Sequence, residues 1–187
     1  MNNSKNYFCL LMFSLLFLAP AIQAQTSDLL KYLDKTCQGE ENKGVIYLDD
    51  PEDLIPYLAI FNNGKIWVKN RKTGSLEKFR PAISMHGSYI YVIDSAGRFY
   101  ISYHNEIDKF HHSSLVAGDP VLCAGELRID YISGKITYLN NASGHYKPGP
   151  ENLNLAVKLL RDYGMETRGM ILGITNGSDY REITLKN

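Results

Sequence analysis

An excess of charge of one sign is missing from this chain of 187 residues, in which 20 Lys and Arg residues balance 20 Asp and Glu residues. The basic residues are also not gathered into a long run. A protein that grips nucleic-acid phosphates needs a clustered basic face, and one that lies on a membrane surface needs a basic amphipathic helix. The composition therefore predicts no nucleic-acid partner and no attachment to a membrane surface.

A hydrophobic run long enough to cross a membrane is missing as well. The apolar stretch near the start spans residues 7–19, whereas a transmembrane helix needs about 20 residues. Lys5 precedes this stretch, and the small residue Ala24 follows it. This order of residues is typical of a cleavable secretory signal peptide. We therefore expect a signal peptide at 1–24, one globular domain at 25–187, and a secreted or periplasmic protein with no stable membrane insertion after cleavage.

Cysteine is scarce, and one of the three cysteines, Cys9, lies in the expected signal peptide. Cys37 and Cys123 remain, and an oxidising compartment would favour a disulfide between them. Such a disulfide would stabilise the fold by about 4–5 kcal/mol in the chain-entropy model. The alternative is that Cys123, between Leu122 and Ala124, is a small buried core residue. Both interpretations stay open here, because sequence spacing does not test bond geometry.

Short β-prone segments make up most of the chain, and turn-forming pairs such as Asn63-Gly64 and Ser133-Gly134 separate several of them. Strands that are linked by hairpin-length turns pair antiparallel. We expect an α+β fold: a mostly antiparallel β-sheet or a partly closed barrel, with an N-terminal helix and one C-terminal helix. The strands are expected at 45–48, 57–62, 65–69, 88–93, 98–103, 119–130, 135–139, 170–175 and 183–185.

The two expected helices flank these strands. The first begins at Ser27 or Asp28, which are good caps, and ends before Gly39. The second has the clearer pattern, because Pro150 suits a first helical position and Gly164 suits the residue just after a helix. Apolar residues recur at helical spacing between them.

Three segments contain the side chains with the most chemical potential. We call them the His-Ser segment (110–118), the Ala-Gly-Glu segment (123–127) and the Ser-Gly-His-Tyr segment (140–148). They flank predicted strands and are expected to converge. The candidate catalytic residues are His112, Ser113, Glu126 and His145. The candidate ligand-binding residues are Ser114, Ser143, Gly144, Tyr146 and Lys147.

The order of these segments resembles the C-terminal domain of the plant IQ-motif-containing calmodulin-binding (IQM) family over roughly residues 90–165. Leu115 and Cys123 depart from that pattern. The chain has no IQ motif, because Ile22-Gln23 lies in the expected signal peptide without a following basic pattern. The resemblance therefore implies a related fold, and it does not support calmodulin binding. The residues that carry it are Phe110, His112, Ser113, Ser114, Ala117, Gly118, Ala124, Gly125, Ser143, Gly144, His145, Tyr146 and Pro148.

A catalytic interpretation of these segments lacks a complete motif. There is no Gly-x-Ser-x-Gly sequence, and neighbours such as His112 and Ser113 would point to opposite faces of a strand. Glu126 on its strand, with a Ser-Ser step upstream, resembles ADP-ribosyltransferase toxins only in part. The spacing of His111, His112 and His145 matches no compact metal-ligand motif, so neither a metal nor a cofactor is predicted.

His145 and Lys147 come just before the second helix, and helix N-termini favour anions. The alternative is structural: a tight turn at Ser143-Gly144 in which polar groups satisfy one another. The function that we expect is therefore an exported effector or binding module, whose ligand is an unknown protein or a small anion. A small hydrolase or transferase is the other hypothesis, and a large exposed aromatic patch would favour the binding module.

Overall fold

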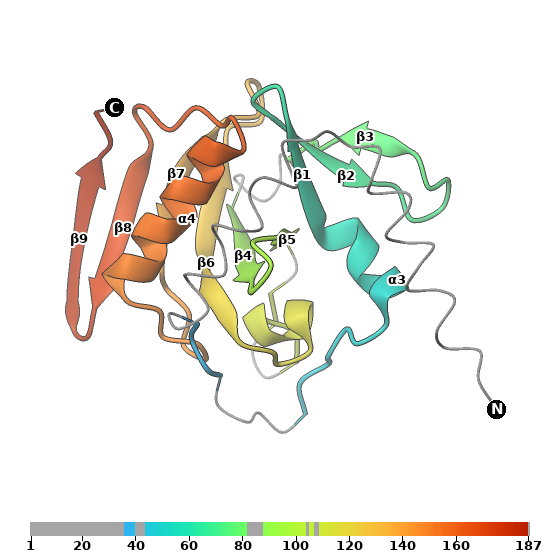
Figure 1. The fold of residues 1–187 in the computed structure, drawn as a ribbon, viewed down its shortest axis with the longest axis horizontal. Helices are drawn as coiled ribbons and strands as arrows, with labels where there is room; N and C mark the ends of the chain where they lie inside the picture. Colours follow the sequence, from blue (N-terminus) through green and yellow to red (C-terminus); the bar gives the residue numbers. More distant parts are fainter. Residues whose placement is uncertain (1–35, 40–43, 82–87, 104, 107–108, 187) are drawn as a thin grey trace. The chain divides into compact units, whose positions relative to one another are not determined.

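The fold is built around a mixed β-sheet, seen here in a computed structural model that describes residues 36–39, 44–81, 88–103, 105–106 and 109–186. In this part of the chain nine strands lie in the order β3-β2-β1-β5-β4-β6-β7-β8-β9 (Figure 1). The strands are β1 (Leu58–Asn62), β2 (Lys65–Lys69), β3 (Leu76–Lys78), β4 (Ser88–Asp94), β5 (Phe99–Ser102), β6 (Val121–Ile129), β7 (Ile136–Asn140), β8 (Ile171–Asn176) and β9 (Asp179–Thr184). The helical elements are α3 (Pro51–Leu54), η2 (Ile55–Tyr57), η4 (His112–Val116) and α4 (Pro150–Asp162).

The expected α+β fold with a mostly antiparallel sheet is confirmed. Seven of the eight strand pairs of this sheet are antiparallel, and β7 and β8 form one parallel pair. The parallel pair follows from the chain order, since α4 connects β7 to β8 and a helix is long enough for a crossover. The described strands end in two edges, β3 and β9, so the sheet is open and does not close into a barrel.

Both faces of the sheet are buried around β4, where every residue except Ser88 is buried. Ile90 and Val92 belong to an apolar cluster with Leu115 of η4. Tyr91 points to the other face and stacks with Phe99 of β5. Successive side chains of a strand point to opposite faces. The side chains of β4 therefore contribute to buried clusters on both faces of the sheet. Such a continuous apolar run is typical of a strand that is covered on both sides.

Helix α4 covers one face of the sheet and packs on β6 and β8 (Figure 1). It begins at Pro150, and Gly164 with φ of 77° follows its end, as the sequence predicts. Asn152 fixes its start: Nδ2 donates to the carbonyl of Leu122 at 2.8 Å, and Oδ1 accepts from the amide of Gly149 at 2.9 Å. No helix in the described ranges is long and apolar enough to cross a membrane.

Some sequence expectations are wrong. Residues 45–48 form no strand, although Ile46 and Leu48 each donate one backbone hydrogen bond, to Lys109 and Ser114. These hydrogen bonds to distant parts of the same chain hold the β-prone segment 45–48 in place without a partner strand. The short elements α3, η4 and β3 were not expected, because three to five residues show no measurable periodicity. The predicted signal peptide and the first helix up to residue 35 lie outside the described residues.

The disulfide between Cys37 and Cys123 is not formed, and both are free thiols. Cys37 pairs through its backbone with Val121, which anchors residues 36–39 to the start of β6. Burial raises the pKa of Cys123 to about 12 and that of Cys37 to about 11. Neither thiol is therefore ionised at neutral pH, and Cys123 is a buried core residue, which was the alternative interpretation.

Replacing Asn152 by Ala tests how α4 is attached to the sheet. The change leaves the buried carbonyl of Leu122 without this donor, so the free energy of unfolding should fall by about 1–3 kcal/mol. Urea denaturation measures the loss. Asn154→Ala is the matched control, because Asn154 is exposed on the same helix. Equal losses in the two variants would contradict the assigned role of Asn152.

Candidate functional site

The His-Ser segment folds as the 3-10 helix η4 rather than as part of a strand. His111 precedes η4 in an extended conformation, and its amide donates to Oγ of Ser114 at 3.0 Å. Ala117 and Gly118 end the turn with positive φ angles of 51° and 81°. A Gly at the second position allows this left-handed conformation without strain. The segment thus turns sharply beneath the sheet, and its side chains are fixed by the turn.

His112 attaches η4 to β6. Its Nε2 donates to the carbonyl of Gly125 at 2.9 Å, since a carbonyl oxygen can only accept. Burial lowers the pKa of His112 to about 4, the bond to Gly125 opposes this, and the nearby rings of His111 and His145 lower it further. His112 is therefore a neutral imidazole with its proton on Nε2 at neutral pH.

The two serines that follow, Ser113 and Ser114, are fully buried, and the exposed fraction of each residue is 0%. Oγ of Ser113 lies 3.2 Å from Nδ1 of His111. Oγ of Ser114 accepts a hydrogen bond from the amide of His111. A nucleophile must be reached by its substrate, and these hydroxyls face the interior.

The Ser-Gly-His-Tyr segment is a tight turn that leads into α4. Ser143 accepts from the amide of Tyr146 at 3.3 Å through Oγ, and from the amide of Lys147 at 2.8 Å through its carbonyl. The hydroxyl of Tyr146 donates to the carbonyl of Asp119 at 2.8 Å, just after η4. The turn therefore connects the His-Ser segment to the start of α4. Gly144 has open space where a side chain would begin.

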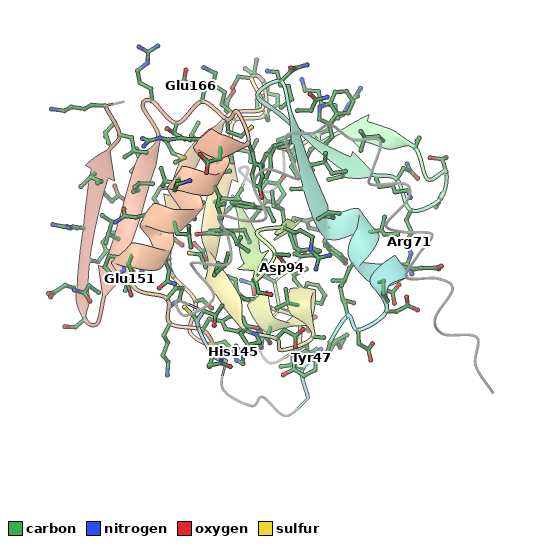
Figure 2. All side chains as sticks on the ribbon, viewed as in Figure 1. Tyr47, Arg71, Asp94, His145, Glu151 and Glu166 are labelled. Atoms are coloured by element: carbon green, nitrogen blue, oxygen red, sulfur yellow. The ribbon has the colours of Figure 1, made fainter. Side chains whose placement is uncertain are left out.

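His145 is buried where the ends of these segments meet. In Figure 2, His145 and Glu151 mark the end of the sheet at which α4 begins. Its ring centroid lies 5.8 Å from that of His111 and 4.5 Å from that of Tyr146. A Cβ atom on Gly39 would lie 1.8 Å from its Nε2. Gly39 was interpreted only as a helix end, and the structure shows that it allows residues 36–39 to pass against His145.

Glu126 belongs to a different group of polar side chains. Its amide donates to Oδ1 of Asn140 at 2.7 Å, and Nδ2 of Asn140 lies 3.4 Å from Oε2 of Glu126. A Cβ on Gly125 would lie 2.1 Å from the carbonyl oxygen of Asn140. The backbone of Asn140 therefore approaches β6 closely at Gly125.

Asparagines are the polar residues that the sequence analysis missed. Asn141 donates through Nδ2 to the carbonyls of Pro148 and Thr175 at 2.7 and 2.8 Å, and accepts from the amide of Thr175 at 2.8 Å. It thereby ties the Ser-Gly-His-Tyr segment to β8. The adjacent pair Asn140-Asn141 at the end of an apolar strand was the available signal, because buried amides need several partners.

The start of α4 already has a carboxylate beside it. A Cβ on Gly149 would lie 2.4 Å from Oε1 of Glu151, and the Gly149 amide already donates to Asn152. The predicted small anion near Lys147 would meet this negative charge. Within the described ranges, no group of three or more His, Cys, Asp or Glu side chains is arranged to hold a metal ion.

A groove of about 700 Å³ lies away from these segments, on the half of the sheet that contains β2 and β3. We call it the aromatic groove. Its walls combine aromatic, aliphatic and charged side chains from β2, β3, the residues after β3, β4 and the residue after β5. The lining includes Trp67, Leu76, Glu77, Lys78, Arg80 and Tyr103.

Comparison with known proteins gives one family. The family model of the IQ motif-containing protein middle domain matches residues 55–153. The IQ domain-containing protein IQM3 of Arabidopsis thaliana is 32% identical over 116 residues, which cover 60% of this chain and 23% of that protein. This chain therefore spans less than a quarter of the length of the relative. No solved structure matches it.

The expected secreted or periplasmic location is contradicted by this comparison. The relative on which this correction rests is an IQ domain-containing protein of a plant.

The pH dependence of stability tests the burial of His112. Its pKa is about 4 in the folded protein and about 6.5 when unfolded, so the unfolded state binds more protons between these values. Stability should therefore fall as the pH drops from 6.5 to 4, by up to about 3 kcal/mol from this group. Urea denaturation of wild type and His112→Gln across this range should show a shallower fall in the variant. Parallel pH profiles would contradict the assignment.

Proposed function

Since this chain belongs to the family of the IQ motif-containing protein middle domain, we propose that it is a binding module, which holds a protein partner and catalyses no reaction. The observation that carries the proposal is the complete burial of Ser113 and Ser114. Buried and hydrogen-bonded polar groups stabilise a fold but cannot meet a substrate without local opening.

The other candidate residues support the same interpretation. His112 is neutral and holds β6 through Gly125, and Glu126 is bonded to Asn140. A general base is most effective when its pKa lies near the working pH, whereas that of His112 is about 4. These side chains join segments of the protein to one another.

A hydrolase or transferase is the second candidate, and one contact favours it. Oγ of Ser113 lies 3.2 Å from Nδ1 of His111, which is close to hydrogen-bond distance for a nucleophile and its base. The His145 ring lies 5.8 Å from the His111 ring. For this pair to react, η4 would have to move and expose Ser113.

The partner that we propose is a protein other than calmodulin. The relative is an IQ domain-containing protein, but Ile22-Gln23 is the one Ile-Gln pair in this sequence and no basic pattern follows it. Calmodulin recognises basic amphipathic helices, and α4 carries buried apolar residues on the face that meets the sheet.

The variant Ser113→Ala separates the two candidate functions. For a binding module, hydrolysis of p-nitrophenyl acetate and of NAD should stay at the buffer rate for both wild type and variant. The melting temperature should fall by about 2–4 °C, because a buried hydroxyl is lost. Turnover by the wild type that Ser113→Ala abolishes without a change in melting temperature would overturn the proposal.

Calmodulin binding is tested by size-exclusion chromatography of the full chain with calmodulin, with and without calcium. We expect the two proteins to elute separately in both conditions. A peptide with an intact IQ motif serves as the positive control for the calmodulin preparation. Co-elution of the full chain would contradict the proposed choice of partner.

A further inference from the structure

The aromatic groove contains an unsatisfied hydrogen-bond donor. Nε1 of Trp67 is buried, and it has no partner among the described residues. A buried indole N–H normally finds an acceptor, and leaving it unpaired costs about 1–3 kcal/mol. Because this nitrogen has almost no solvent-exposed surface, a ligand oxygen in the groove reaches it only if the surrounding side chains shift.

The charges that line the groove are unbalanced. Glu77 accepts from Nδ2 of Asn70 at 2.9 Å and from Oγ of Ser75 at 3.2 Å, so its carboxylate is already engaged. Lys78 and Arg80 take part in none of the ion pairs of the described residues. Two cations and one carboxylate therefore line the groove, and this net positive charge favours an acidic ligand.

The groove lies beside an open edge of the sheet. Strand β3 pairs with β2 on one side, and no described strand pairs with its other side (Figure 1). All three residues of β3 are exposed, and Leu76 is 42% exposed. Tyr103, at another wall of the groove, is 62% exposed. An edge strand with exposed apolar side chains offers both backbone hydrogen bonds and anchoring sites to an extended peptide.

We infer that the aromatic groove binds an extended acidic segment of a partner protein, which adds a strand along β3 and places carboxylates near Lys78 and Arg80. The inference rests on the proposed binding function and names the class of its ligand. An apolar side chain of the segment packs against Leu76 and Tyr103, close to the ring of Trp67. Because β3 has only three residues, it offers few backbone hydrogen bonds to a partner strand. The partner therefore also needs the side-chain contacts of the groove.

Selection of random dodecapeptides displayed on phage against the full chain tests this inference. The double variant Lys78→Glu/Arg80→Glu serves for counter-selection. We expect enriched peptides to be rich in Asp and Glu that alternate with apolar residues. A synthetic enriched peptide should then shift the fluorescence of Trp67, which is the single tryptophan of the chain. The double variant should bind it roughly tenfold more weakly or worse.

Arg181→Glu is the matched control, since Arg181 is an exposed cation on β9 at the other edge of the sheet. It should leave the affinity unchanged. The inference is overturned if no peptide is enriched, if the enriched peptides carry no excess of acid, or if the double variant binds them equally well. It is also overturned if heparin or single-stranded DNA displaces the peptide and shifts Trp67 more strongly. These outcomes leave the test of Ser113 untouched, so the proposed binding function can stand or fail separately.

Discussion

The close contacts at Gly125 are the constraint on which the surrounding structure depends. Its carbonyl accepts from His112, and its missing side chain lets the backbone of Asn140 approach. A Cβ atom there would lie 2.1 Å from the Asn140 oxygen. One residue of β6 therefore holds η4 and the end of β7 together, and the Ser-Gly-His-Tyr segment follows directly from β7. Any other residue at this position would push these segments apart.

This arrangement separates the parts of the molecule that build the fold from the part that we propose for binding. Histidines, serines and asparagines lie at one end of the sheet, where they bond to carbonyls, amides and one another. These contacts explain the places of these residues in the fold without any chemistry. The aromatic groove instead presents exposed apolar side chains and two cations that have no ion-pair partner among the described residues. Unsatisfied groups at a surface are the ones a partner can stabilise.

The sequence predicted the parts of the fold that have strong periodicity. Strand β2 and helix α4 were found with nearly correct bounds, because alternation and an apolar stripe are local properties. Strand β3 was missed, because three exposed residues have no pattern. The contact of Asn140 with Gly125 was not predicted, since no local signal links residues on different strands. The sequence also could not show that His112 and Ser113 lie in a 3-10 helix, which brings neighbouring side chains into different contacts.

The central claim is that the His-Ser segment is a buried structural element held by Gly125. Long-range proton–nitrogen NMR of the His112 ring, recorded from pH 7.5 to pH 5, tests this claim most directly. The account predicts a neutral ring with its proton on Nε2 across the whole range, because the pKa is about 4. Titration of the ring with a pKa near 6.5, or a proton on Nδ1, would contradict it and would show that the segment opens to solvent.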